Sequence, residues 1–349
     1  MSRKQFGGKF TSEWERVYEQ SPNWKDGRFV NLTGITAGGN WRRMPEIICK
    51  QIRGHSESSP KKPLPILPLD RETFLRGDGG IRFVWYGHSV VLLRINGKTV
   101  LVDPMFGNDT APIAPTKNRR FSTDALALID ALPPIDFVLL THDHYDHLDY
   151  SSFKKLKGRV GAFHVALGNK RHLLAWGIED ERIREFDWWQ SLETDGLRFT
   201  FTPTQHFSGR GINSIAKSLW GGWAIRSDSH NIWFSGDSGY IPHFVEIGSR
   251  LGPFDLAFME CGQYCVDWPE VHMFPEQSVQ AAVDAGASRV VPVHWGAFNL
   301  SYEHAWYEPG MKFAEACDRV GLPYGLPRLG EVVEFGDSMP RSAWWDAFR

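Results

Sequence analysis

The chain has 349 residues, of which 42% are hydrophobic, 23% charged and 13% aromatic. This composition excludes a disordered, collagen-like or coiled-coil chain, and the length suits one large domain or two modest ones. The 39 basic and 41 acidic residues leave a net charge of −2, so no positive field attracts nucleic acid.

Residues 1–80 differ from the rest because glycine, proline and charged residues are frequent there, as in 36–39 and 58–63. We expect an N-terminal arm, largely extended with one short helix, that packs on a main domain of residues 81–349. The helix is expected at 41–53, where apolar side chains accompany four basic groups and one acid. This mixture also suits a membrane-surface helix, but packing on the protein body or on a partner subunit is favoured.

From residue 81 onward, predicted strands and helices alternate. The turn Asn96-Gly97 is typical of a β-hairpin and joins strands expected at 89–95 and 99–102. The other strands are expected at 82–86, 136–140, 160–165, 197–202, 223–226, 231–235, 255–259 and 289–293. Helices are expected at 123–131, 151–156, 169–176, 242–251, 275–285 and 310–320. This order predicts an α+β or α/β fold with one mixed sheet, or two, covered by helices.

The sequence carries no recognisable targeting or membrane-spanning signal. The basic start at residues 1–9 is not followed by the apolar stretch of a secretory signal. No window approaches the roughly 18–20 consecutive apolar residues of a membrane helix. The cysteines fit neither a zinc pattern nor a disulfide framework: Cys49, Cys261, Cys265 and Cys317. We therefore expect a cytoplasmic protein with reduced thiols.

A dense group of metal-ligand residues follows the strand expected at 136–140, namely His142, His144, Asp146 and His147. Side chains two residues apart on an extended loop point the same way, so His142 and His144 can bind one ion. Asp146 and His147 fall on the next turn and can serve a second ion. Burying so many imidazoles and carboxylates without a cation is costly, which disfavours a chance cluster.

Three further ligand-type residues stand just after predicted strands: His206, Asp237 and His294. The carboxyl ends of strands are where α/β folds gather functional loops. Gly236 and Gly239 let the chain turn sharply beside Asp237. One such residue alone is more often a hydrogen-bonded core residue, but together with the dense group they favour a shared site.

Seven ligands of these types suit two metal ions. We expect one ion to be bound by His142, His144 and His206. We expect the other to be bound by Asp146, His147 and His294, with Asp237 between the two. Nitrogen and oxygen donors suit Zn²⁺ first, and Mn²⁺ or Fe²⁺ fits the same donors. Two ions about 3.5–4 Å apart can hold a bridging hydroxide and stabilise the charge that develops when it attacks, so the pattern indicates a hydrolase.

The ligand pattern resembles that of the metallo-β-lactamase superfamily. More closely, residues 83–335 resemble N-acylphosphatidylethanolamine phospholipase D and its bacterial relatives. The segments that carry the resemblance are Trp85-Tyr-Gly-His88, Leu101-Val-Asp-Pro104, Pro133-Pro-Ile-Asp136, His142-Asp-His-Tyr-Asp-His-Leu-Asp149, Asp187-Trp-Trp189, Leu219-Trp-Gly221, Gly236-Asp-Ser-Gly-Tyr240, Gly252-Pro-Phe-Asp-Leu256 and His294-Trp-Gly296. The tryptophan motifs and Gly252–Leu256 are particular to this branch. Phe29-Val-Asn31 is similar to the family's arm, but residues 32–80 match poorly.

The resemblance implies a four-layer αββα sandwich of two mixed sheets flanked by helices, with two zinc ions. It implies hydrolysis of a phosphodiester that releases an N-acylethanolamine and phosphatidic acid, with catalytic roles for Asp146, Asp237 and His272. His272 would contact the substrate phosphate or assist proton transfer. His88 and Asp103 match positions that support the ligands from behind, and His304 also falls in a family-like stretch, where a structural role is favoured. A homodimer and peripheral contact with a membrane are further expectations.

Residues 261–271 depart from the family pattern in a loop that shapes the substrate pocket, so the substrate stays open. A lactonase or other ester hydrolase is the alternative enzyme on the same scaffold. A nuclease is disfavoured by the net charge of −2 and by the lack of an inserted domain. A non-catalytic metal-bearing protein that binds lipid or a partner is disfavoured by the complete ligand set.

Overall fold

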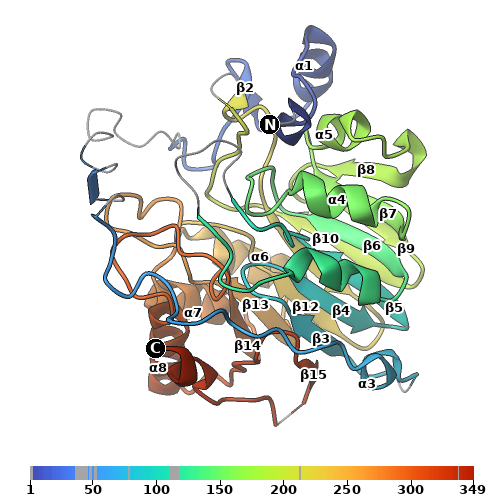
Figure 1. Ribbon diagram of the computed structural model, residues 1–349. Coiled ribbons are helices and arrows are strands. Elements are labelled where there is room, and N and C mark those ends of the chain that lie inside the picture. Colours follow the sequence, from blue (N-terminus) through green and yellow to red (C-terminus); the bar gives the residue numbers. More distant parts are fainter. Residues whose placement is uncertain are drawn as a thin grey trace.

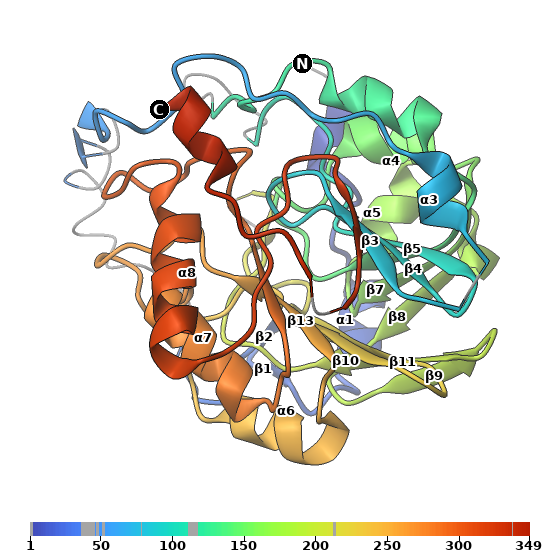
Figure 2. The ribbon, with the colours of Figure 1, turned by 90° about the horizontal axis from the view of Figure 1, so that it is seen from below.

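The computed structural model describes residues 3–35, 46, 49–50, 53–77, 79–110, 118–211, 214–336 and 338–349. Within them, two large β-sheets face each other and helices cover the outer faces (Figures 1 and 2). The αββα sandwich implied by the family resemblance is confirmed, and of the two arrangements left open by the element order, two sheets are found.

In the described residues, the first sheet has seven strands in the order β15-β3-β4-β5-β6-β7-β8. They are β3 (Arg82–Trp85), β4 (Val91–Ile95), β5 (Lys98–Val102), β6 (Ile135–Leu140), β7 (Val160–Ala166), β8 (Ile183–Phe186) and β15 (Val332–Glu334). Neighbours from β15 to β5 pair antiparallel, and those from β5 to β8 pair parallel. The expected β4–β5 hairpin forms, with positive φ at Asn96 and Gly97.

The second sheet, over the same described ranges, has six strands in the order β14-β13-β12-β11-β10-β9. They are β9 (Ser191–Thr194), β10 (Leu197–Thr202), β11 (Gly222–Arg226), β12 (Asn231–Phe234), β13 (Leu256–Glu260) and β14 (Val290–Val293). Strands β12, β13 and β14 are parallel, and the remaining pairs are antiparallel. Each sheet therefore has a parallel portion whose strands end at a common edge.

Helices complete the two outer layers (Figure 2). The first sheet is covered by the 3₁₀ helix η3 (Ala125–Ala131), α4 (Tyr150–Leu156) and α5 (Lys170–Ala175). The second is covered by α6 (His243–Leu251), α7 (Pro275–Asp284) and α8 (Glu308–Val320). The short 3₁₀ helix η4 (Asp180–Arg182) lies between α5 and β8, and η6 (Trp344–Phe348) is the last element in the element order. Asp149 caps α4 by accepting from Ser151 N and Ser152 N, so the helix begins just after the metal-ligand loop.

The main core lies between the sheets. Phe83 packs on Phe258 with ring centroids 5.0 Å apart, and Phe137 packs on Phe199 at 4.9 Å. Among the described residues, the tryptophans exposed by 2% or less are Trp85, Trp220, Trp223, Trp233, Trp295, Trp306 and Trp345. These large rings serve core packing, which holds the strand ends in place.

Residues 3–77 hold more regular structure than the expected extended arm with one helix. The elements are η1 (Arg3–Phe6), α1 (Ser12–Tyr18), the pair β1 (Trp24–Lys25) and β2 (Arg28–Phe29), and α3 (Arg71–Leu75). The expectation was wrong because Tyr18, Trp24 and Phe29 form a small aromatic cluster, with Trp24 and Phe29 centroids 4.9 Å apart. The helix expected at 41–53 lies outside the described residues apart from 46, 49–50 and 53.

Strands β8, β9 and β15 were not predicted because they are short and about half of their side chains are polar. The helix expected at 123–131 is the 3₁₀ helix η3, in which Ala127 N donates to Asp124 O and Leu132 N to Ile129 O. All four cysteines lie in the described ranges and are free thiols. No described helix has the length and hydrophobicity needed to cross a membrane.

Candidate metal centre

Seven ligand-type side chains converge where the parallel strands of both sheets end. The loop after β6 carries the dense group, and one residue each follows β10, β12 and β14. All seven residues singled out in the sequence lie in this cluster: His142, His144, Asp146, His147, His206, Asp237 and His294. Carboxyl ends of parallel strands share an edge, which is why residues so distant in sequence meet here.

His142, His144 and His206 form the first group. The His144 Nδ1 atom lies 2.9 Å from His142 Nε2 and 3.2 Å from His206 Nε2. His142 and His206 are buried, whereas His144 is half-buried beside Phe207, with ring centroids 4.5 Å apart. Three ring nitrogens therefore face one point. His144 is the most exposed of the three imidazoles, and its side of the group is called the open side below.

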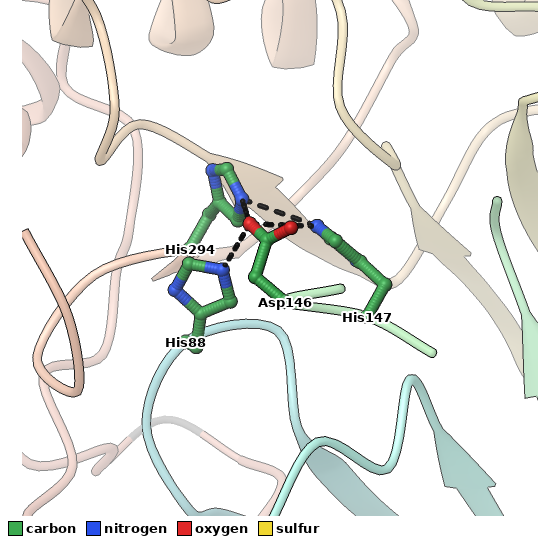
Figure 3. Close-up of side chains that lie close together, drawn as sticks. All are labelled: His88, Asp146, His147 and His294. Atoms are coloured by element: carbon green, nitrogen blue, oxygen red, sulfur yellow. Dashed lines mark hydrogen bonds and ion pairs between the residues drawn. The ribbon is translucent and has the colours of Figure 1, made fainter. Parts of the chain in front are cut away.

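Asp146, His147 and His294 form the second group, and His88 joins them (Figure 3). The Asp146 Oδ2 atom lies 3.4 Å from His294 Nε2, 3.6 Å from His147 Nε2 and 2.9 Å from His88 Nε2. His88 is thus a direct partner of the Asp146 carboxylate. His88 and His294 have positive φ values of 52° and 68°, a strained conformation that concentrates at functional sites.

Asp237 stands between the two groups. Its Oδ2 atom lies 3.1 Å from His147 Nε2 and from His294 Nε2, 3.8 Å from His142 Nε2 and 3.7 Å from His206 Nε2. Its Oδ1 atom is buried and has no hydrogen-bond partner among the described residues. A buried carboxylate oxygen left without a donor is costly, and cations bound on both sides would satisfy it.

The pKa values of the imidazoles differ between the two groups. Burial lowers the pKa of His142 and of His206 well below the usual range, so both imidazoles are neutral. Burial acts the same way on His294, but the Asp237 charge and the contacts to Asp146 and Glu260 together outweigh it and raise the pKa of His294 to about 9. Burial opposes ionisation of Asp237, yet His147 and His294 hold its pKa well below the usual range. A cation would therefore replace a proton near Asp237.

Contacts from outside the cluster orient the imidazoles. Asp103 Oδ2 accepts from His147 Nδ1 at 2.8 Å, and Asp103 also binds Thr141 N and Thr141 Oγ1. Val271 O accepts from His206 Nδ1 at 3.0 Å. Because Nδ1 carries the proton in both cases, Nε2 of His147 and of His206 is left to bind a metal.

Asp143, inside the metal-ligand loop, was missed in the sequence. It is fully buried and accepts from Gly209 N, Ser218 Oγ and His172 Nε2. Gly8 N donates to His172 Nδ1, so His172 is neutral, and burial lowers its pKa to about 3. Asp143 thus connects the metal-ligand loop to helix α5 and to the segment that contains Gly209 and Ser218. No sequence motif predicts that role, because the partners are distant in sequence.

Asn31, in the arm, was not identified as a site residue either. Its side-chain amide donates to His206 O at 2.9 Å, and its carbonyl accepts from His206 N at 3.1 Å and from Trp220 Nε1 at 2.9 Å. It belongs to the Phe29-Val-Asn31 segment that resembles the family arm, which was the only signal available.

The candidates for supporting roles are placed differently. His272 has a ring nitrogen within 4.8 Å of ligand atoms of His206 and Asp237. His304 contacts other groups, stacking on Tyr264 and donating from Nδ1 to Ala305 O. Glu260, the last residue of β13, lies under His272 and His294 and was missed because the strand expected at 255–259 stopped one residue early.

Comparison with known proteins agrees with this geometry. Residues 98–295 match the model of the beta-lactamase superfamily domain. A protein of Mycobacterium tuberculosis is 38% identical over 94% of this chain and 88% of its own length. A metallo hydrolase structure from the archaeon Ignicoccus hospitalis covers 73% of this chain and 98% of that one, with a TM-score of 0.57 and 20% identity, and shows the same fold. The chain belongs to the metallo-β-lactamase superfamily and is a metal-dependent hydrolase.

Within that superfamily, the chain is similar to a phospholipase. It is 29% identical to N-acyl-phosphatidylethanolamine-hydrolyzing phospholipase D 1 of Caenorhabditis elegans, over 85% of this chain and 90% of that enzyme. The name of this relative makes N-acylated phosphatidylethanolamines a substrate class to test.

Proposed function

We propose that this chain is a dinuclear zinc phosphodiesterase of phospholipase D type, acting on lipids like N-acylphosphatidylethanolamine. The observation that carries the proposal is the position of Asp237. Its Oδ2 atom lies within 3.8 Å of imidazoles from both groups, and its Oδ1 atom is buried without a partner among the described residues. The C. elegans relative, whose name states the lipid activity, supports the substrate class.

The two groups would each hold one ion. The first ion would be held by His142, His144 and His206. The second would be held by Asp146, His147 and His294, with Asp237 shared. When bound, the pair would supply an activated water and neutralise charge on the phosphate oxygens. Zinc suits these nitrogen and oxygen donors best, and manganese or iron fits them as well.

In this proposal His272 acts on the substrate. Its side chain is 13% exposed, which leaves it accessible beside the buried ligands. In the proposed reaction, the bond between phosphorus and the ethanolamine oxygen breaks. The oxygen of water is added to phosphorus, and His272 contacts the phosphate or gives a proton to the departing oxygen. The products are an N-acylethanolamine and phosphatidic acid.

Apolar side chains near the open side suit a lipid. Phe207 lies against His144 and His206, with ring centroids 4.5 and 4.9 Å away. Leu32 and Ile35, next to Asn31 in the arm, are 51% and 42% exposed. We propose that residues 1–80 act as an arm on the domain of residues 81–349 and present this surface to acyl chains or to a membrane.

A lactonase remains the competing enzyme because the loop of residues 261–271 differs from the family pattern. The test is to incubate the zinc-loaded protein in ¹⁸O-water with N-acylphosphatidylethanolamine, a plain phosphodiester and a panel of lactones. The proposed function predicts turnover of the lipid, with label in phosphatidic acid and none in the ethanolamine. Turnover of lactones alone, with label in the carboxylate, would overturn it.

A further inference from the structure

Glu260 is the last residue of β13 and lies beside His272 and His294 at the metal centre. Its side chain is buried, with 1% exposed. The Oε1 atom accepts from Ser238 N at 3.1 Å and from Met273 N at 2.9 Å. Two backbone donors on one oxygen fix the orientation of the carboxylate, so the direction in which Oε2 points is set by the fold.

Oε2 of Glu260 faces two imidazoles. It lies 3.2 Å from His272 Nδ1 and 3.5 Å from His294 Nδ1. His294 Nδ1 is buried and has no hydrogen bond within the described ranges. The acceptor that lies opposite it is Oε2 of Glu260. Oε2 of Glu260 therefore contacts both His294, a metal-ligand candidate, and His272, the histidine proposed to act on the substrate.

The hydrogen bonds of Glu260 decide what these contacts mean. Oε1 already accepts from two backbone N–H groups, so Oε2 is the oxygen left to accept from the imidazoles. An ionised carboxylate only accepts hydrogen bonds, so an imidazole nitrogen that faces it must carry the proton. With the proton on Nδ1, Nε2 is left free on the side of the ring that faces the site.

We propose that Glu260 is a positioning residue that sets the tautomer and orientation of His294 and His272 together. It presents Nε2 of His294 to the metal and Nε2 of His272 to the substrate. The His272 half rests on the proposed function, whereas the His294 half requires only that a metal binds. One carboxylate would thus align the metal centre with the group that handles the substrate.

The substitution Glu260→Gln tests the proposed role of Glu260. The amide has nearly the same shape as the carboxylate, but one of its two polar groups donates hydrogen bonds instead of accepting them. If the amide oxygen keeps the two backbone donors, the NH₂ group faces the imidazoles and favours the tautomer with the proton on Nε2. If the amide is reversed, NH₂ meets Ser238 N and Met273 N, and both donors lose their acceptor. The first arrangement is expected because it keeps both backbone hydrogen bonds, and it disfavours binding of a metal by His294 Nε2.

A matched control is Glu185→Gln. Glu185 is also an acid that accepts from two backbone amides, Gly168 N and Lys170 N, but it lies away from the metal-ligand imidazoles. Its replacement should leave zinc affinity unchanged. This comparison separates loss of a structural carboxylate from loss of the orienting contact.

The experiment measures zinc affinity by competition with a chelator and the imidazole tautomers by ¹⁵N NMR of the zinc-loaded protein. We expect Nδ1–H on His294 and His272 in the unaltered protein. We expect zinc affinity to fall about 10–100-fold in Glu260→Gln, the usual effect of losing such a support, and not in Glu185→Gln. At saturating zinc, kcat should still be lower in Glu260→Gln because His272 is misaligned.

A proton on Nε2 of His294 in the unaltered protein would overturn the proposal, and this measurement needs no variant. Zinc affinity of Glu260→Gln within about twofold of the original would also overturn it, since that is well below the effect of a lost metal-site support. Both readouts are independent of substrate. If they succeed while the lipid is not hydrolysed, the proposed function fails and the role of Glu260 toward His294 stands.

Discussion

The side-chain amide of Asn31 forms hydrogen bonds with both the backbone N–H and the backbone C=O of His206, 175 residues away. Such a two-point contact restrains the peptide on either side of the imidazole as a strand neighbour would. It connects the N-terminal arm to the first group of metal ligands.

Replacing this residue should weaken the metal site. Asn31→Ala leaves buried backbone groups of His206 without partners, which costs about 1–3 kcal/mol of unfolding free energy. Zinc affinity should fall, and Asn31→Asp should not restore it, because a carboxylate oxygen would then face the His206 oxygen that accepts from the Asn31 amide. Asn23→Ala, which removes a contact to Asp187 in the same arm, is the control. Equal effects of Asn23→Ala and Asn31→Ala on zinc binding would contradict a specific role.

Metal analysis should find two zinc ions per chain after careful loading. Removal of Asp237, the carboxylate between both groups, should reduce kcat/KM at least ~10²-fold, as loss of a transition-state contact does. Asp237→Ala should still unfold cooperatively, because it also removes an unpartnered buried oxygen. One ion or none in the original protein, or retained turnover in the variant, would show that the assignment is wrong.

Zinc binding should depend on pH. Because the pKa of His294 in the metal-free protein is raised to about 9, zinc displaces a proton from it at neutral pH. Affinity should therefore rise with pH up to that value, by about tenfold per pH unit for each proton displaced. Calorimetry in buffers with different ionisation enthalpies counts the released protons. An affinity that is constant between pH ~6 and ~8 would contradict protonation of His294.

His272 and His304 should respond differently to alanine substitution. His272→Ala should lower kcat about 10²–10⁴-fold with little change in zinc content, as expected when a proton donor is lost. His304→Ala should keep kcat, because its ring stacks on Tyr264, but it should lower the melting temperature. Steady-state kinetics and thermal unfolding of both variants check this. A large loss of kcat in His304→Ala would place that residue in the site.

The local pattern of the chain accounts for most of the fold. Apolar strands, the Asn96-Gly97 turn and helix caps such as Asp149 are encoded by neighbours in sequence, so they could be predicted. Edge strand β9 was missed because most of its side chains are polar, although it pairs with its neighbour β10. The aromatic cluster around Trp24 could not be predicted because distant contacts help to form it, such as the hydrogen bond that Phe29 N donates to Ala216 O.

The same division holds for the site. The sequence alone determined the seven ligand candidates, because metal ligands need particular side chains just after strands whose order can be recognised. The resemblance implied supporting roles for His88 and Asp103, but only the tertiary structure revealed the other residues that hold the ligands in place. Asn31, Asp143 and Glu260 act through contacts with residues elsewhere in the chain, namely His206, Gly209 and His294. An ordinary Asn, Asp or Glu has no spacing that marks such a contact until folding brings its partner to it.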